Sequence, residues 1–347
     1  MREVLSSLLI HWLQPAQRFP PEHAFHQFKQ ILMRGAAPQD GSSFALNDSL
    51  RKTFPGRFKT ISPAAVELHV TMDLLADQPC RVELTADTHS ERACLPDVDQ
   101  LTGCLLLLDR GYFDLDWFEC LKDAGGFYIA RGKNTINPNV VSARREDGKL
   151  LKALQGKSLK AVKPQLPKRQ RTELDVAWIK DGKKIQVRLI AFWDKQEKRF
   201  TWLTTNLPSE QFSLEDISEA YRLRWQIELL FKEWKSYANL HRYDTDKAPV
   251  AEGLIWAAIA AALVKRFICH STQRIMGKVI SSRKTAMSCT LLFCQMMSSL
   301  MRQNRKKMRH YARQLMIFLG NLAHRAHPKR DRVSGKFRLG LEPCEVA

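Results

Sequence analysis

Five polar side chains recur at helical spacing near the middle of the chain, and their types are suited to chemistry on an anion. They are Tyr221, Arg224, Glu228, Lys232 and Lys235. On a helix that turns about 100° per residue, all five fall within an arc of about 80°. Guanidinium and ammonium groups bind anionic oxygens, and a carboxylate binds hard metal ions. The spacing therefore predicts one helix face that carries anion-binding and cation-binding groups in a row.

The segment that positions these side chains has the features of one amphipathic helix. Ser213 is a suitable N-cap, acidic residues follow in the first turn, and neither proline nor glycine occurs before Ala238. A separate apolar arc predicts the buried face of this helix. Its members are Leu223, Ile227, Leu230, Phe231 and Trp234. The alternative is an ordinary solvated face in which Arg224 and Glu228 form an i,i+4 ion pair.

Two further acids stand at predicted strands. Residues 105–108 are four leucines without alternation, which predicts a strand buried on both faces. Asp109 follows directly, at the carboxyl edge where open α/β sheets place their chemistry, although a plain strand-end turn is the alternative. Asp40 stands in a short extended segment over 36–44, and the glycine that follows it leaves a simple turn as the alternative.

A predicted hairpin supplies another acid. Residues 66–75 and 80–87 alternate apolar and polar side chains around four turn residues, which predicts two antiparallel strands. Asp87, at the end of the second strand, is expected to cap a short helix. Asp87 is also the alternative to Asp40 as the first acid of a site.

The pattern as a whole resembles a known family. The spacing Tyr-x2-Arg-x3-Glu-x6-Lys, with Asp40 before glycine and Asp109 in Asp-Arg-Gly-Tyr, is similar to that of DDE-type insertion-sequence transposases of the Tyr-Arg-Glu-Lys branch. These are cut-and-paste enzymes, and the resemblance runs from about residue 40 to about residue 235. It implies an α/β, ribonuclease H-like core in which Asp40, Asp109 and Glu228 are the catalytic and metal-binding acids.

The resemblance also implies a reaction and its partners. Such enzymes hydrolyse phosphodiester bonds at the ends of the element, often with a hairpin step, and then join the freed 3′ hydroxyl to target DNA. Two Mg²⁺ ions, for which Mn²⁺ can substitute, would stabilise the attacking and leaving oxygens. The partners implied are double-stranded DNA and a second protomer in a synaptic complex. The groups expected to contact DNA beside the acids are Tyr221, Arg224, Lys232 and Lys235.

A basic stretch adds further candidate DNA contacts. Residues 152–171 contain seven Lys or Arg and no acid, which in so basic a chain favours contact with a DNA backbone over a plain solvated face. Lys168, Arg169 and Arg171 are the predicted contacts. Trp202 either stacks on an unpaired base, as a tryptophan in a similar segment of relatives does, or faces the core of a strand.

These features divide the chain into five predicted segments. They are a short helical segment over 1–35, the first part of the core over 36–132, a β-rich insertion over 133–207, the core helix with the catalytic glutamate over 208–245, and a helical C-terminal region with a basic tail over 246–347. Strands are predicted over 127–131, 174–179, 184–193 and 200–206, and helices over 114–124, 248–268, 285–301 and 303–324.

Composition limits the class of protein. The formal net charge of +19 over 347 residues favours a polyanionic partner, with nucleic acid first. The longest apolar run, residues 254–264, is too short to span a bilayer, and the N-terminus is a poor signal peptide. The eight cysteines have no zinc-type spacing, which indicates free thiols in a reducing compartment. We therefore expect a bacterial cytoplasmic, nucleoid-associated protein without a membrane partner.

The short N-terminal segment leaves two alternatives open. Only 39 residues precede Asp40, fewer than relatives usually have, so the chain could be a truncated, catalytically silent DNA-binding or inhibitory remnant. A ribonuclease H-like nuclease is the other alternative. Residues 302–338 carry twelve Lys or Arg against the single acid Asp331, which favours a DNA-facing helix and tail in any of these cases.

Overall fold

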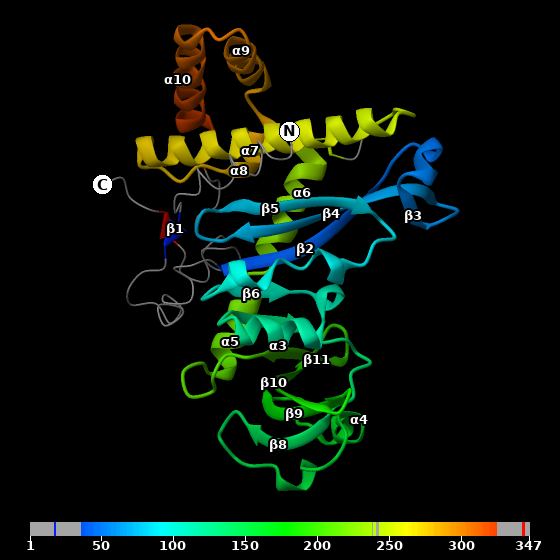
Figure 1. Cartoon of the computed structure of the whole chain (residues 1–347). Coiled ribbons are helices and arrows are strands. Elements are labelled where there is room, and N and C mark those ends of the chain that lie inside the picture. The colour runs from blue at the N-terminus through cyan, green and yellow to red at the C-terminus, as the bar shows by residue number, and fades with distance from the viewer. Residues whose placement is uncertain (1–16, 19–35, 238, 241–242, 325–341, 344–347) are drawn as a thin grey trace. The chain divides into compact units, whose positions relative to one another are not determined.

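The computed structural model describes residues 17–18, 36–237, 239–240, 243–324 and 342–343. The chain forms two compact units, each built from separate segments. The Asp109 unit comprises residues 21–40 and 90–225, and the Glu228 unit comprises residues 1–20, 41–89 and 226–347. Strands and helices are both abundant, which confirms the mixed α/β class (Figure 1). The helical segment predicted over 1–35 lies outside the described residues, except for the two residues of β1 (Gln17–Arg18), which pair with β12 (Glu342–Pro343).

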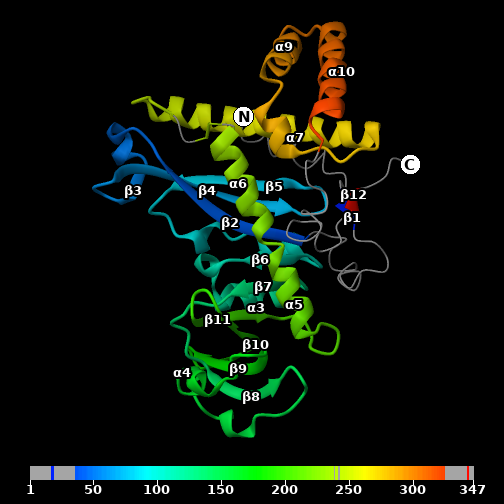
Figure 2. The same ribbon diagram turned by 180° about the vertical axis from the view of Figure 1, so that it is seen from behind.

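The Asp109 unit is built on a mixed sheet (Figure 2). In its described part the strand order is β2 (Ala36–Ala45, of which residues 36–40 belong here), β6 (Leu105–Leu108), β7 (Phe127–Arg131), β11 (Arg199–Thr205), β10 (Lys183–Asp194), β9 (Thr172–Lys180) and β8 (Asn139–Arg145). The pairs among β2, β6 and β7 are parallel, and the pairs from β7 to β8 are antiparallel. The four leucines of β6 are at most 1% exposed, which confirms the doubly buried strand.

Helices cover this sheet through aromatic and aliphatic packing. α3 (Leu115–Asp123) begins at Asp114, whose carboxylate accepts backbone N–H bonds in the first turn. Its Phe118 stacks on Tyr128 of β7 with ring centroids 4.1 Å apart. α4 (Leu159–Val162) closes a second apolar cluster against β8 to β11, and α5 (Leu214–Arg222) begins with a full capping box between Ser213 and Asp216.

The Glu228 unit combines a hairpin with long helices. β3 (Pro55–Phe58), β4 (Ser62–Asp73) and β5 (Gln78–Ala86) are antiparallel, and the β4–β5 pair confirms the predicted hairpin. The helices are α6 (Trp225–Tyr237), α7 (Ala248–Met276), α8 (Ser282–Met287), α9 (Thr290–Met301) and α10 (Arg305–Leu322). The apolar side of β4 packs with α6 and α7 in one cluster. The members of the predicted apolar arc that lie on α6, from Ile227 to Trp234, are no more than 5% exposed, and Leu223, just before the helix, is buried as well.

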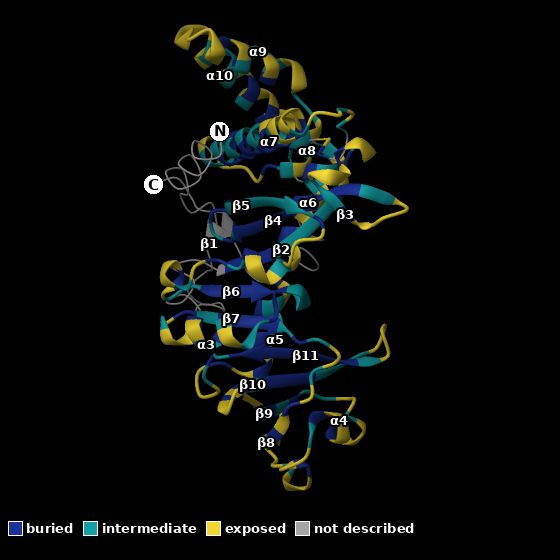
Figure 3. Ribbon diagram, turned by 45° about the vertical axis from the view of Figure 1, so that its right-hand side comes forward, coloured by how far each residue is buried: buried dark blue, intermediate teal, exposed yellow. Residues whose placement is uncertain are grey.

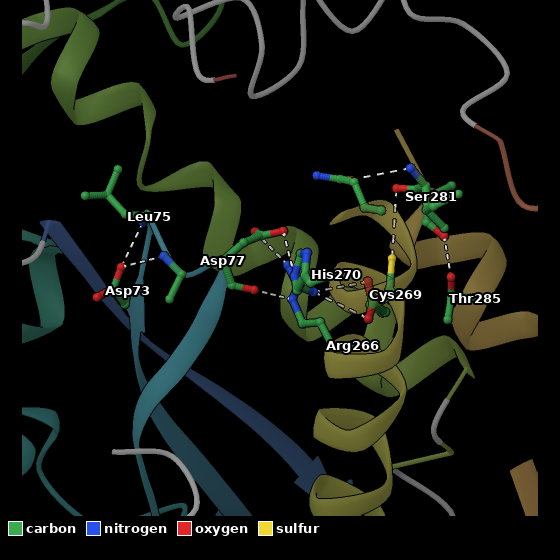
Figure 4. A network of polar contacts seen from close by, with 12 residues as sticks. Asp73, Leu75, Asp77, Arg266, Cys269, His270, Ser281 and Thr285 are labelled. Carbon is green, nitrogen blue, oxygen red and sulfur yellow. Dashed lines mark hydrogen bonds and ion pairs between the residues drawn. The ribbon is translucent and has the colours of Figure 1, made fainter. Parts of the chain in front are cut away.

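A buried ionic network joins the hairpin to α6 and α7 (Figure 4). Arg266 of α7 lies 2.8 Å from Oδ1 of Asp77 in the β4–β5 turn and 3.4 Å from Oε2 of Glu233 on α6. Nε2 of His270 lies 3.5 Å from Oδ2 of Asp77. Burial alone lowers the pKa of Arg266, but the two carboxylates outweigh it and raise that pKa above its usual value, so the guanidinium stays charged.

The length of α7 corrects one prediction. Within the described ranges α7 is long and apolar enough to cross a bilayer by length and composition alone. The helix runs beyond the apolar run at 254–264 and ends at Met276, before Gly277 with its left-handed φ of 60°, so the prediction that this segment is too short was wrong. Within the described structure, 33% of the apolar window of this helix is buried. α7 carries the buried, paired Arg266 and contributes to two apolar clusters, as expected of a core helix.

Candidate active site

Asp40 and Asp109 lie side by side on neighbouring parallel strands. The register of β2 and β6 pairs Gln39 with Leu108, and the residue that follows each of them in the chain is an aspartate. Paired strands are about 4.8 Å apart, which places the two aspartates next to each other where β6 ends. Asp40 lies inside β2, which continues to Ala45, so the interpretation of Asp-Gly as a simple turn was wrong.

Glycines near both aspartates make room for acidic neighbours. A Cβ on Gly111 would overlap the carboxylate of Glu91, and a Cβ on Gly41 would lie 2.5 Å from Oε1 of Glu67. Neither glycine adopts a positive φ. A larger residue at either position would have to displace the neighbouring carboxylate, whereas the backbone conformation itself does not require glycine.

Tyr221 and Arg224 place their polar groups beside these two aspartates. The Tyr221 hydroxyl donates to the carbonyl oxygen of Leu108 at 3.3 Å and lies 3.4 Å from Oδ1 of Asp109. Nη1 of Arg224 donates to Oδ2 of Asp40 at 2.9 Å, and both side chains are mostly buried. Burial raises the pKa of Tyr221 well above its usual value, so its phenol remains a hydrogen-bond donor at any ordinary pH.

The helix that carries these residues is interrupted, which corrects the prediction of one continuous helix. α5 ends at Arg222 and α6 begins at Trp225. The N–H groups of Leu223 and Arg224 bond to carbonyls three residues earlier, the tighter pattern of a turn. Tyr221 and Arg224, on either side of Leu223, are the two side chains that contact Asp109 and Asp40. The interruption of the helix therefore coincides with these tertiary contacts, and no proline or glycine in the sequence marks it.

The remaining residues of the predicted row lie on α6, in the Glu228 unit. Glu228, Lys232 and Lys235 follow one another at i, i+4 and i+7, which keeps them on one side of this helix. Glu228 is half-buried and Lys232 is exposed. Nζ of Lys235 donates to the carbonyl oxygen of Ser43 at 2.8 Å, and burial lowers the pKa of this lysine. Four of the predicted residues therefore lie together in the Asp109 unit, namely Asp40, Asp109, Tyr221 and Arg224. The other three, Glu228, Lys232 and Lys235, lie on α6 of the Glu228 unit.

The donor types at the strand ends fit a divalent cation. Asp40 and Asp109 offer carboxylate oxygens, the ligands that Mg²⁺ prefers. Across the described ranges, no three His, Cys, Asp or Glu side chains are grouped closely enough to hold a metal. The two aspartates therefore supply suitable ligands and do not complete a site by themselves.

Asp87 does not cap a helix, so that prediction was wrong. The short helix that follows starts only at Glu91. Asp87 is 3% exposed, and its Oδ2 accepts the backbone N–H of Arg57 at 2.8 Å while its Oδ1 accepts the Ser43 hydroxyl. The Arg57 guanidinium also lies 3.0 Å from Glu67. Sequence could not show this cluster, because its members come from separate strands and loops.

Trp202 faces the core, and another tryptophan is exposed. Trp202 is 2% exposed and stacks on Phe200 within the apolar cluster of β8 to β11, so it does not present a face to a DNA base in this structure. Trp225 is 56% exposed and follows Arg224 directly. Large exposed aromatics are uncommon and suit stacking on an unpaired base. The only feature of the sequence that could have suggested a role for Trp225 was its position next to Arg224.

The three basic residues predicted to contact DNA, Lys168, Arg169 and Arg171, differ in exposure and in whether they already form an ion pair. Lys168 and Arg169 are exposed, and Nζ of Lys168 lies 4.2 Å from the centre of the Trp193 ring. Arg171 forms an ion pair with Glu146 at 2.6 Å. Lys168 and Arg169 are therefore the better placed of the three for an external anion.

Comparison with known proteins establishes the family. The family described as "Transposase DDE domain" matches residues 40–264, a range that begins at the first predicted acid. The chain belongs to the DDE transposase family. It is 24% identical over 277 residues to the transposase for insertion sequence element IS231B of Bacillus thuringiensis subsp. berliner, covering 70% of this chain and 57% of that protein. It is 23% identical over 274 residues to the IS1151 transposase of Clostridium perfringens, covering 69% and 58%.

This DDE transposase chain thus spans little more than half the length of those relatives. Among solved structures, piggyBac transposase in a synaptic complex with hairpin DNA is similar with a TM-score of 0.47 and 11% identity, over 82% of this chain and 57% of that one. Family membership rests on the sequence match.

Proposed function

We propose that this DDE transposase cleaves the ends of an insertion sequence and joins them to target DNA, and that it belongs to the Tyr-Arg-Glu-Lys branch. The observation that carries the proposal is the contact of Tyr221 and Arg224 with Asp109 and Asp40 on adjacent strands. All four positions have the residue types and spacing of that branch. The core proposed is ribonuclease H-like, with residues 133–207 as its insertion.

In this proposal Asp40, Asp109 and Glu228 hold divalent ions, Mg²⁺ or Mn²⁺, which stabilise charge on the attacking and leaving oxygens when bound. Arg224 orients Asp40 before DNA arrives and then clamps a phosphate bidentately. Tyr221, kept protonated by burial, donates its hydroxyl to a phosphate oxygen. Lys232 and Lys235 supply positive charge along the side of α6 that carries Glu228.

The partners proposed are the element's ends, target DNA and a second protomer in a synaptic complex. Lys168, Arg169 and Arg171 of the insertion are proposed backbone contacts. The proposed location is the bacterial cytoplasm, in association with the nucleoid. A basic protein that acts on DNA has its substrate there.

The test is strand cleavage of DNA that carries the repeats flanking the gene, in Mg²⁺. Wild type is expected to leave 3′ hydroxyl ends. Asp109→Asn is expected to bind the same DNA and cut it at least about 10³-fold more slowly, since it removes a metal ligand. Asp99→Asn changes an exposed aspartate of the same unit and should cut normally. Equal cleavage by wild type and Asp109→Asn would refute the site.

A further inference from the structure

One side of α10 carries a row of exposed cations. Arg305, Lys306, Arg309 and Arg313 are exposed, and on a helix they fall within an arc of about 100°. We call these four residues the α10 basic stripe. Leu315 and Leu319 of α10 are buried in an apolar cluster with residues of α7 and α9, on a face that borders the stripe. Figure 3 shows both buried and exposed residues along α10. The helix is therefore fixed by its apolar side, and the stripe has no part in that packing.

The charges of the stripe are not compensated within the described residues. α10 contains no Asp or Glu from Arg305 to Leu322. No ion pair in the described ranges joins the stripe to a carboxylate. Arg305, Arg309 and Arg313 repel one another at i,i+4, and cations in the first turns oppose the helix dipole. The arrangement works against helix stability, so folding does not account for it.

The spacing of the stripe matches a polyanion. Arg305 and Arg313 are eight residues apart, which is about 12 Å along a helix axis. Phosphates of one DNA strand advance about 3.4 Å along the duplex axis, so the stripe spans about four of them. Long exposed Lys and Arg side chains reach phosphate oxygens and do not by themselves discriminate between base pairs.

We propose that the α10 basic stripe is a contact surface for the phosphate backbone of duplex DNA, used without regard to base sequence. The proposal rests on the proposed function for the choice of partner. It assigns to α10 a share of the affinity for DNA that is separate from the chemistry at the acids.

The experiment measures binding of the full chain to a 30-base-pair duplex of arbitrary sequence between about 50 and 200 mM NaCl. The test variant combines Arg305→Gln, Arg309→Gln and Arg313→Gln. Each lost phosphate contact lowers the slope of log K against log salt by about 0.9, so the slope should fall by about 2 to 3. Affinity at 0.1 M salt should fall at least about tenfold, by the same factor on a second duplex of unrelated sequence.

Two controls separate this surface from overall charge and from folding. Lys183→Gln, Lys184→Gln and Lys198→Gln remove three exposed cations, two at the start of β10 and one in the turn that follows it, all close in sequence to an acid. This variant should keep the wild-type slope. Replacing the three arginines of α10 by lysine should keep most of the affinity, because a point charge suffices for a phosphate. The glutamine variant should melt no lower than wild type, since its lost charges opposed the helix dipole.

The result that would overturn the proposal is an unchanged slope in the α10 variant, or an equal loss in the Lys183 control. A change of oligomeric mass with unchanged DNA affinity would also overturn it, because the stripe would then serve a protein partner. The test does not depend on cleavage. If wild type binds through the stripe but never cuts DNA, the proposed function fails and the surface stands.

Discussion

Arg224 and Tyr221 organise the strand ends before any substrate is present. Arg224 fixes one oxygen of Asp40 at 2.9 Å, and the Tyr221 hydroxyl lies 3.4 Å from Asp109. Both contacts come from residues next to the turn between α5 and α6. The same groups that are proposed to hold phosphate therefore restrict the aspartates in the free protein, which lowers the cost of arranging them when DNA binds.

Trp225 leads to the first prediction at this scale. Trp225→Ala should weaken binding to a duplex with an unpaired base at its end by about 1 to 3 kcal/mol, because stacking on that base is lost. Trp225→Phe should retain most of the affinity. Fluorescence anisotropy with unpaired and fully paired duplexes measures the difference. Trp202→Phe is the matched control, and it should lower stability but not affinity, since its ring is buried. Equal binding by wild type and Trp225→Ala would contradict the prediction.

His69 predicts a dependence of stability on pH. Burial, with smaller effects from His89, Arg81 and Arg57, lowers its pKa from 6.5 to about 4. Between those values the unfolded chain binds more protons than the folded chain, so stability falls as the pH drops from 6.5 to 4. The loss should reach about 3 kcal/mol, at about 1.4 kcal/mol per pH unit.

The matched variant is His69→Gln, which can keep a bond to the hydroxyl of Thr85, 3.1 Å from the His69 ring. Urea unfolding at pH 7 and at pH 4.5 should show a clearly smaller acid loss in this variant than in wild type. Parallel pH profiles for the two proteins would show that His69 does not titrate as described.

At the scale of elements, α6 is held by groups outside its own sequence. Its apolar side packs on β4 and α7, and its Glu233 shares Arg266 with Asp77 of the hairpin turn. Glu228 lies five residues before Glu233 on the same helix. The position of Glu228 within its unit therefore depends on a buried network more than one turn away.

This network predicts strong coupling between its members. Arg266→Met should destabilise the protein by about 3 to 5 kcal/mol, because Asp77 is left buried without its cation. Asn suits position 77, whose φ is 52°, so Asp77→Asn removes charge with little strain. The loss of unfolding free energy in the double variant, measured by urea unfolding, should be smaller than the sum of the losses in the two single variants by about 0.5 to 3 kcal/mol. Strict additivity would contradict the network.

Across the whole molecule, regular elements were predictable and the contacts between distant segments were not. The β4–β5 hairpin, β6, β7 and the strands β9 to β11 follow local apolar patterns. β8 was missed because its Asn-Val-Val-Ser-Ala-Arg-Arg sequence is short and largely polar. The break at residues 223–224 and the environment of Asp87 depend on tertiary contacts. The sequence also left open whether Trp202 faces the core or a DNA base, because both sides of β11 are buried and its pattern shows no exposed side.

The most direct test of the central claim, that Glu228 acts with Asp40 and Asp109, is single-turnover DNA cleavage in Mg²⁺ by Glu228→Gln. The account predicts wild-type DNA affinity with cleavage reduced at least about 10³-fold. Glu215→Gln, an exposed carboxylate at the start of α5, should cleave at the wild-type rate. Cleavage by Glu228→Gln at the wild-type rate would contradict the claim and remove Glu228 from the site.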